Sequence, residues 1–494
     1  MSIMKSLSCA NLISMGRHIP TPFHLSLAEG QQALDIESIL RIVPGRRLVA
    51  LARWQDRLVI VKLFFHARHW ERKLRSDLSG INFLTQSKLP TPKVLLQTTT
   101  EDGSGGVLII EYLQQGKSLN VLFDEATSEA ELEAGMNLAI KTIALCHRAG
   151  LWQKDIHLDN FMLADGKVYL LDGGDIQREQ GKLDSKTRMQ NLALFVAQFP
   201  AVFDGKAPSL LQEYRQHVAV ASEVEGTEFK TQIRQARKLR LAKFERKLFR
   251  STTANKRGRS SDKFCVYDRS IHSSELERFI QHPDSFIRQD KLLKQGNSST
   301  VALVEIDGRV FVLKRYNIKS FWHGLSRMLR PSRAHHSWRN ASVLEMLGVA
   351  TPHPYLFLEE RVFWIFRCRA YFLCEHIHEQ DMGTQWGKES GSGAADESTG
   401  IDSIGEVVTL FRQFLRLMSD YRISHGDMKA TNFIIHDKRL YVLDLDAMRR
   451  HQSRKVFAQK FSADLARFRK NWLDSPLGLP VDLMIQEIQL LQAD

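Results

Sequence analysis

Apolar residues along this chain follow strand-like and helix-like spacings in the same order twice. The runs RLVIVKLF, residues 57–64, and GRVFVLKRY, residues 308–316, are rich in Val, Ile and Leu and predict strands. Later in each half, apolar positions recur at helical spacing, at Leu132, Met136, Ile140 and Ile143 and again at Val407, Phe411, Phe414 and Met418. Each half therefore predicts a small β-rich lobe followed by a helical lobe, which is an α+β organisation in two tandem domains.

An acidic hairpin follows the long helix in both halves. The stretch KDIHLDNFMLADGKVYLLDGG, residues 154–174, returns in altered form as GDMKATNFIIHDKRLYVLDLDA, residues 426–447. A lone Asp in such a stretch is often a turn former or a helix N-cap, but that reading does not explain a repeated set with the same internal spacing. The first set is Asp155, Asn160 and Asp172, and each member has a counterpart 272 residues later at Asp427, Asn432 and Asp444.

A change in charge and pattern divides the chain. Between Glu228 and Arg259 there are 12 Lys or Arg against two Glu, and the strand signals disappear. Leu241, Phe244 and Leu248 form an apolar stripe there, so a helix in this segment is expected to pack on a lobe or to lie on anionic lipid. We expect an N-terminal tail over 1–25, a first domain over 26–220, a basic linker over 221–262 and a second domain over 263–494.

Bulk composition favours a soluble globular protein. The chain has 494 residues, of which 43% are apolar and 25% are charged, so two or three domains are expected. Its five cysteines form no CxxC pair, which is typical of reduced thiols in a cytosolic protein. No run of 18 uncharged apolar residues predicts a transmembrane segment, and the N-terminus lacks the three-part signal-peptide pattern. The net charge is +13, but no nucleic-acid recognition motif accompanies it, so we expect no nucleic-acid partner.

The repeated residues suit phosphoryl transfer from ATP, which needs charge neutralisation, metal ions and a group that takes the acceptor proton. An aspartate in the first loop of each hairpin stretch can orient a hydroxyl, and a lysine on a strand can meet the phosphates. The expected proton acceptors are Asp155 and Asp427, and the expected phosphate-binding lysines are Lys62 and Lys314. The expected ligands of Mg²⁺ are Asn160, Asp172, Asn432 and Asp444.

This order of landmarks resembles the protein-kinase-like fold. HGDMKATNFII with LDLDA matches the H-x-D-x-K-x-x-N catalytic loop and, loosely, the D-F-G element. The first copy, QKDIHLDNFML with LDGGD, has Gln153 in place of the loop histidine and His157 in place of the loop lysine. The resemblance implies ATP and Mg²⁺ as cofactors, and catalytic roles for Lys429 and His157 beside the two aspartates.

Further landmarks of that fold are less specific. LIIEYLQQGKSL resembles the hinge that holds adenine and places Glu111 to Leu113 there, and YFLCEHI places Glu375 in the second copy. KQGNSSTVALVEIDG resembles a phosphate-covering loop with Gly296, and VPGRRLVALARWQDR supplies Gly45. The helix that usually carries a glutamate partner for the lysine has Gly80 and Asn340 at the expected place. The candidate substitutes are Asp77, Glu71 and Glu345.

Residues 312–359 are similar to the lipopolysaccharide core kinases, which phosphorylate heptose or Kdo sugars. The lysine strand, the stretch LRPSRAHHSW and the turn GVATPHP carry this resemblance, and only 50 residues follow Asp444, with no A-P-E element. The resemblance implies a core-glycolipid acceptor and a cytoplasmic enzyme peripheral to the anionic inner membrane. Residues suited to that surface are Trp322, Arg327, Arg330, Arg333, Trp338 and Arg339.

Two alternatives remain open from the sequence. One or both copies could be pseudokinase scaffolds, which the missing helix glutamates and the missing loop histidine of the first copy favour. The D-x-H-x-x-N pattern at His157 also resembles small-molecule phosphotransferases that act on aminoglycosides or choline.

Overall fold

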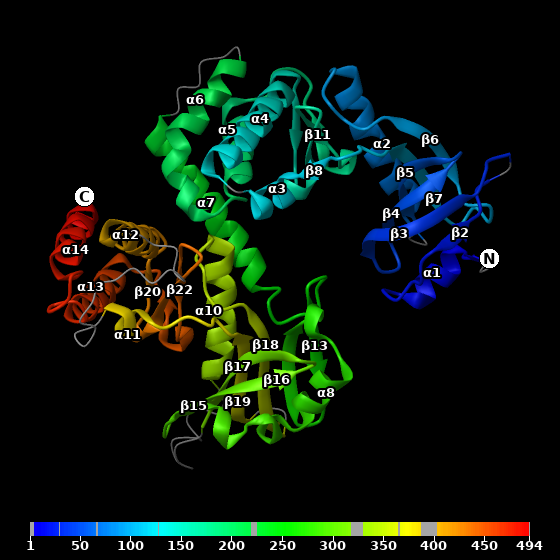
Figure 1. Cartoon of the computed structure of the whole chain (residues 1–494). Helices are drawn as coiled ribbons and strands as arrows, with labels where there is room; N and C mark the ends of the chain where they lie inside the picture. The colour runs from blue at the N-terminus through cyan, green and yellow to red at the C-terminus, as the bar shows by residue number, and fades with distance from the viewer. Residues whose placement is uncertain are drawn as a thin grey trace. The chain divides into compact units, whose positions relative to one another are not determined.

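The computed structural model describes residues 4–28, 30–65, 68–126, 128–218, 225–317, 330–363, 366–386 and 403–493. These residues divide into two compact units, each with a β-sheet and a mainly helical part (Figure 1). Unit 1 is Met1–Phe199 with Phe203–Arg237, and unit 2 is Pro200–Val202 with Lys238–Asp494. The chain is thus a mixed α and β protein, as its apolar pattern predicts.

The sheet of unit 1 has seven strands in the order β1-β2-β3-β4-β5-β7-β6. Helix α2 packs on one face of this sheet, where Leu74 and Ile81 contact Leu108 and Ile110 of β7 in one buried cluster. The elements are β1 (Lys5–Ser6), α1 (Cys9–Met15), β2 (Phe23–Leu25), β3 (Leu34–Val43), β4 (Arg47–Trp54), β5 (Arg57–Phe64), α2 (Trp70–Gln86), β6 (Val94–Thr99) and β7 (Gly106–Glu111).

The helical part of unit 1 surrounds a short hairpin, β10 with β11, that pairs Phe161 with Leu170 and Ala164 with Lys167. Its core joins α4 to α5, α6 and the first half of α7. The elements are β8 (Lys117–Ser118), α3 (Leu119–Glu125), α4 (Glu129–Arg148), β9 (Leu151–Gln153), η1 (Leu158–Asn160), β10 (Phe161–Ala164), β11 (Lys167–Leu170), η2 (Gly173–Asp175), β12 (Ile176–Arg178), α5 (Ser185–Val196), η3 (Ala201–Lys206), α6 (Ala207–His217) and α7 (Gly226–Glu245).

The sheet of unit 2 also has seven strands, in the order β13-β14-β18-β19-β17-β16-β15. Helix α10 packs against β18 and β19. The elements are β13 (Asn255–Arg259), β14 (Lys263–Asp268), η4 (Arg269–Ile271), α8 (Ser274–Gln281), η5 (Pro283–Phe286), η6 (Gln289–Lys291), β15 (Leu292–Gln295), β16 (Ser299–Ile306), β17 (Arg309–Tyr316), α10 (Arg333–Leu347), β18 (Pro354–Val362) and β19 (Phe366–Glu375).

The helical part of unit 2 holds the second hairpin, β21 with β22, which pairs Phe433 with Val442 and His436 with Arg439. Helix α12 packs on α14, and α13 contacts β20. The elements are α11 (Met382–Trp386), α12 (Ile404–Asp420), β20 (Ile423–Ser424), η8 (Ala430–Asn432), β21 (Phe433–His436), β22 (Arg439–Val442), η9 (Leu445–Ala447), β23 (Arg449–Arg450), α13 (Arg454–Lys470) and α14 (Gly478–Ala493).

The two sheets share five strands in the same spatial order. The order β3-β4-β5-β7-β6 in unit 1 equals β15-β16-β17-β19-β18 in unit 2, and a helix follows the third strand in each. The additional strands differ, because β1 and β2 extend the β3 edge whereas β13 and β14 extend the β18 edge. The predicted lysine strands are β5 and β17, the predicted long helices are α4 and α12, and both predicted hairpins are present.

Two segments differ from the sequence-based expectation. Residues 1–25 are not a tail in their described part, because β1 and β2 join the first sheet, and Leu12 of α1 lies with Phe23 and Leu25 of β2 in its core. The expected linker 221–262 contains α7, whose Phe229 lies in the core of unit 1 while Leu241 lies in the core of unit 2. The strand near the end of this segment, β13, belongs to the second sheet. Apolar side chains spaced among the basic ones account for this packing.

Arg237 of α7 also departs from expectation. It is one of the basic residues of the segment expected to be a linker, but its side chain is fully buried. Its guanidinium pairs with the buried Asp204 and donates a hydrogen bond to the Ala197 carbonyl at 3.1 Å. A buried arginine requires such partners, and they lie 33 to 40 residues away in the sequence.

No described helix has the length and apolar character needed to cross a membrane. The five cysteines are all unpaired, and four of them are buried.

Candidate functional site

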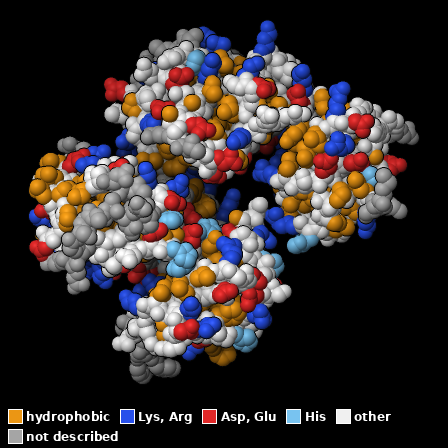
Figure 2. Space-filling model, in the orientation of Figure 1, with side chains coloured by type: hydrophobic (Ala, Val, Ile, Leu, Met, Phe, Trp, Pro, Cys, Tyr) orange, Lys and Arg blue, Asp and Glu red, His pale blue; other side chains and the backbone are white. Residues whose placement is uncertain are grey.

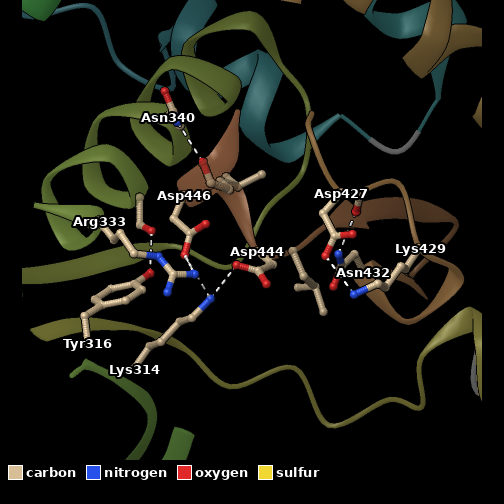
Figure 3. Close-up of polar contacts among 12 residues, drawn as sticks. Lys314, Tyr316, Arg333, Asn340, Asp427, Lys429, Asn432, Asp444 and Asp446 are labelled. Carbon is tan, nitrogen blue, oxygen red and sulfur yellow. Dashed lines mark hydrogen bonds and ion pairs between the residues drawn. The ribbon is translucent and has the colours of Figure 1, made fainter. Parts of the chain in front are cut away.

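In unit 2 the hairpin β21–β22 brings the predicted site residues together (Figure 3). Asn432 ends η8 just before the hairpin, and Asp444 precedes η9 just after it. The backbone N–H of Leu443 donates to the Asn432 carbonyl at 2.9 Å, which closes the base of the hairpin. Asn432 Nδ2 in turn donates to the Asp427 carbonyl at 2.8 Å. Asp427, Asn432 and Leu443, the residue before Asp444, therefore belong to one hydrogen-bonded group.

Lys314 of β17 lies against Asp444, and its ammonium group pairs with the Asp444 carboxylate. Burial raises the pKa of Asp444, but the charge and hydrogen bond of Lys314 outweigh it, so the net pKa lies below the usual value. Asp444 also has φ 53° and ψ 58°, in the left-handed region that non-glycine residues rarely adopt. An ionised carboxylate is thus held in an uncommon backbone conformation facing the strand lysine.

Residues of α13 and of its C-terminal end hold the loop that carries Asp427. The backbone N–H groups of His425 and Gly426 donate to the Asp464 carboxylate at 2.6 and 3.0 Å. Asn471 Nδ2 donates to the Met428 carbonyl at 2.8 Å. The Asp427 carboxylate itself pairs with Lys429, at 3.1 Å, and with Arg467 of α13. Two cations therefore flank the expected proton acceptor.

His425 fills the histidine position of the loop and is fully buried. Burial lowers the pKa of its imidazole, so the ring is neutral. The Asp427 backbone N–H donates to Nδ1 at 3.3 Å, which leaves Nε2 as the protonated nitrogen donating to the Leu443 carbonyl at 3.0 Å. One imidazole therefore links the residue before Asp444 to the backbone of Asp427.

In unit 1 the strand lysine has a different partner. Lys62 Nζ lies 3.0 and 3.1 Å from the two carboxylate oxygens of Asp77 on α2 and donates to the Leu171 carbonyl at 2.9 Å. Both side chains are buried, and burial raises the pKa of Asp77 while the charge of Lys62 opposes the change. Of the candidates Asp77, Glu71 and Glu345, Asp77 is thus the one that pairs with the strand lysine of unit 1. Asp172 lies 3.9 Å from Arg47.

The first acidic loop is held less firmly around its aspartate. The Asp155 side chain is 67% exposed, and its described ion-pair partner is His157, at 3.4 Å from Nε2. Asn160 is buried, and its carbonyl accepts the Leu171 N–H at 3.0 Å, as Asn432 does in unit 2. The hairpin geometry is therefore shared, whereas the surroundings of the aspartate are not.

A buried network supports the loop of unit 1 at Gln153, the position of the missing histidine. Asn191 Nδ2 donates to the Gln153 carbonyl at 2.7 Å, and Asn191 Oδ1 lies 3.1 Å from Nε2 of His147. Tyr214 contacts Nδ1 of the same ring at 2.8 Å. Burial lowers the pKa of His147 to about 4, so a neutral imidazole joins α4, α5 and α6 to the loop.

The expected hinge glutamates have structural partners. Glu111 ends β7 and accepts the Lys93 N–H at 3.2 Å, and Glu375 ends β19 and accepts the His353 N–H at 3.2 Å. Leu113 follows β7 in the adjoining loop. Gly45 and Gly296 each lie between the first two of the five shared strands, and Gly45 has φ 66°. Their placement between strands agrees with the predicted loops, and their role toward phosphate stays a prediction.

Several of the basic and aromatic residues expected at a membrane face make contacts within the protein instead. Trp338 is buried in the core of unit 2, and Arg339 pairs with Glu245 at 3.1 Å. Trp322 and Arg327 lie outside the described residues. Lys and Arg side chains in Figure 2 are interspersed with Asp and Glu over the visible face. The role assigned to Trp338 is therefore wrong, because α10 turns this side chain inward beneath the sheet.

The sequence did not predict several residues of the site. Asp446 lies 3.5 Å from Lys314 Nζ, and Arg333 pairs with it at 2.7 Å (Figure 3). The alternating acids of LDLDA were a signal for Asp446. Asp464 and Arg467 of α13 had no motif around them, and only the packing of α13 under the loop reveals them.

The arrangement suits a magnesium ion through one carboxylate and one amide oxygen, with water and phosphate as the remaining ligands. Asp444 is ionised and one-third exposed, and Asn432 lies at the other end of the same hairpin, next to Asp427. Among the described residues there is no group of three or more His, Cys, Asp and Glu that could hold a metal ion.

No protein-family model matches the chain, and a search of curated proteins found no match.

Proposed function

We propose that the protein is an ATP-dependent phosphotransferase with two protein-kinase-like units, and that unit 2 transfers the phosphoryl group to an alcohol. The observation that carries this proposal is the set of Lys314, Asp427, Asn432 and Asp444 in unit 2, on a strand, a loop and both ends of a hairpin (Figure 3). The five-stranded order with a helix after the lysine strand supports it.

Each residue has a role in the proposed reaction. Asp427 accepts the proton of the attacking hydroxyl, which is the task that needs a carboxylate held in place. Lys314 neutralises phosphate charge, and Asn432 with Asp444 would hold the magnesium ion, which supplies charge neutralisation at the phosphates. Lys429 and Arg467 orient Asp427 through ion pairs.

The acceptor we propose is a heptose or Kdo sugar of the lipopolysaccharide inner core. Lys429 and Arg467 flank the proton acceptor, so an acceptor that carries phosphate or carboxylate groups is favoured over a neutral one. Exposed leucines on α14, Leu479, Leu483 and Leu490, adjoin α13 with its exposed Lys455, Lys460 and Lys470. Figure 2 shows hydrophobic side chains at the surface in the region that Figure 1 labels α14. Apolar and basic side chains together favour contact with an anionic membrane surface.

A second role, nucleotide-binding or structural scaffold, is favoured for unit 1. All three protons of the Lys62 ammonium have acceptors within the protein, in Asp77 and the Leu171 carbonyl. Asp155 is exposed and lacks a counterpart of the Asp427–Arg467 pair among the described residues. The exposed His157 beside Asp155 leaves a small-molecule phosphotransferase as the alternative for this unit.

The test compares single substitutions in the full chain. Asp427→Asn is expected to lower ATP-dependent phosphate transfer to purified core glycolipid by about 10²- to 10⁴-fold, because the proton acceptor is lost. Asp155→Asn is expected to leave most of the transfer, which radiolabelled ATP and mass spectrometry of the glycolipid would measure.

A matched control is Asp437→Asn, in the exposed turn of the same hairpin, where the positive φ of 47° suits Asn as well as Asp. Unchanged transfer in the double variant Asp155→Asn with Asp427→Asn would contradict the proposal. Transfer to choline or an aminoglycoside, with none to the glycolipid, would replace the proposed acceptor.

A further inference from the structure

We propose that Asp446 is the positioning residue for Lys314, and that the acid which holds the strand lysine comes from a loop in unit 2 and from a helix in unit 1. This inference rests on the proposed function of unit 2. It concerns Asp77 and Gly174 in unit 1 and their counterparts Ser337 and Asp446 in unit 2.

The correspondence between the units follows from equivalent contacts. Thr91 Oγ1 donates to the Leu170 carbonyl at 3.0 Å, and Thr351 Oγ1 donates to the Val442 carbonyl at 2.8 Å. Thr351 lies 260 residues after Thr91, and the same offset places Ser337 at the position of Asp77. The 272-residue offset of the acidic stretches places Asp446 at the position of Gly174.

In unit 1 the helix supplies the acid and the loop has none at this position. Asp77 is 1% exposed and accepts from Lys62 through both oxygens. Gly174 has no side chain, and its N–H donates to Asp172 at 3.1 Å. A Cβ at Gly174 would lie 3.3 Å from Asp172 Oδ1 and 4.0 Å from the Cα of Asp77. A carboxylate on that loop position would thus crowd two acids.

In unit 2 the arrangement is reversed. Ser337 of α10 carries no charge, and its hydroxyl lies 2.8 Å from the hydroxyl of Tyr316 on β17. The corresponding residue on β5 is Phe64, which has no hydroxyl to bond. Asp446 is 7% exposed, 3.5 Å from Lys314 Nζ and 2.7 Å from Arg333. Three positions therefore change together between the two units.

The ion pairs around the strand lysine use the same kinds of residue in both units, although these come from different elements. Each site has a lysine and an arginine against two carboxylates, which limits the cost of burying them. In unit 1 these are Lys62, Arg47, Asp77 and Asp172, and in unit 2 they are Lys314, Arg333, Asp444 and Asp446.

The consequence concerns Lys314 during the proposed reaction. In the structure Asp444 also pairs with Lys314, but Asp444 is also one of the residues that would hold a magnesium ion. Asp446 is then the carboxylate that stays beside the lysine and keeps its ammonium group directed toward the end of the second hairpin. Arg333 holds Asp446 from the other side, and both cations lie over the ring of Tyr316, at 4.9 Å for Arg333 and 5.3 Å for Lys314.

The experiment moves the acid within the full chain. Asp446→Gly copies the loop of unit 1, Ser337→Asp copies its helix, and the double variant carries both changes. Asp446→Gly is expected to lower kcat for phosphate transfer by about 100-fold, because the ammonium group of Lys314 would be misplaced. The KM for ATP is expected to rise for the same reason. The double variant is expected to recover at least tenfold of the loss, because the acid again reaches Lys314. Asp446→Asn, alone and with Ser337→Asp, preserves shape if the glycine variants do not fold.

A second readout does not depend on activity. The acetylation rate of Lys314, measured by mass spectrometry with Lys62 as internal reference, is expected to rise in Asp446→Gly and to fall again in the double variant. A wild-type rate of acetylation and of transfer in folded Asp446→Gly and Asp446→Asn would overturn the inference. A folded double variant that stays at the level of Asp446→Gly in both readouts would also overturn the inference, because an acid supplied from the helix would then fail to replace Asp446. If wild type transfers no phosphate but the acetylation pattern holds, the proposed function fails and the positioning role stands.

Discussion

The role of Gln153 in the first acidic loop depends on the buried polar side chains that contact it. Gln153 replaces the loop histidine of unit 2, and the sequence presents this as a loss. In the structure the support at this position comes from His147, Asn191 and Tyr214, which lie on three helices. His147 could not be assigned this role from sequence, because a lone histidine in a helix has no pattern that names its partners.

The neutral state of His147 predicts a pH dependence of stability. Its pKa is about 4 in the folded protein, against about 6.5 when unfolded, because burial disfavours the charged ring and Arg188 adds to the effect. The unfolded state therefore binds the proton first, and stability from this group is complete above pH 6.5 and is lost as the pH falls toward 4. The loss amounts to about 3 kcal/mol.

The measurement is urea unfolding of wild type and His147→Gln between pH 7 and pH 4. The difference in unfolding free energy between them is expected to shrink as the pH falls, since the variant has no ring to protonate. A constant difference over this range would contradict a buried neutral imidazole.

Secondary-structure elements approach each other closely where α2 meets η2. Gly80 lies so near this turn that a Cβ on it would be 1.9 Å from the Gly173 carbonyl oxygen. In unit 2 the corresponding Asn340 donates instead to the Leu445 and Met448 carbonyls, at 2.7 and 3.0 Å. The same helix and loop are thus joined by direct backbone contact in one unit and by an amide side chain in the other.

Gly80→Ala is therefore expected to destabilise unit 1 by about 1–3 kcal/mol, although alanine is the better helix former. The methyl group would push α2 away from η2 and separate Asp77 from Lys62. Thermal unfolding of this variant measures the effect.

Gly205→Ala is the matched control, because a Cβ there has nothing within 4 Å. Equal melting temperatures for the two variants would show that α2 and η2 do not constrain each other.

The strands, helices and hairpins could be predicted from the sequence, because the spacing of apolar residues directly reports which side of an element is buried. Lys62, Lys314 and the residues of both hairpins lie on the predicted elements. Asp464 could not be predicted, because it lies in the middle of a helix and acts through two backbone N–H groups. The strands within residues 1–25 could not be predicted either, since strands of two or three residues give almost no periodic signal.

The whole molecule contains two sets of cores. Each described hydrophobic cluster lies within one unit, including the two that hold Phe195 and Phe411. Separate cores predict that a core substitution in one unit affects the unfolding of that unit alone.

Phe195→Ala and Phe411→Ala are each expected to cost about 3–5 kcal/mol in the unit that contains them. Calorimetry of each variant should show one of two transitions displaced, and the double variant should show both displacements unchanged, because the sites share no partners. A single transition displaced by both substitutions would show that the units unfold together.

The sequence alone determined the repeat, the order of elements and the residues of the two acidic hairpins, because local spacing and composition encode these directly. Tertiary packing was needed to show which acids pair with each strand lysine, Asp77 with Lys62 and both Asp444 and Asp446 with Lys314. Asp77 reaches Lys62 from helix α2, whereas Asp446 lies beside Lys314 on the turn after the second hairpin, and this difference depends on how α2 and α10 pack against those turns. The strand lysine needs a buried negative charge beside it, and several elements around it are near enough to supply one.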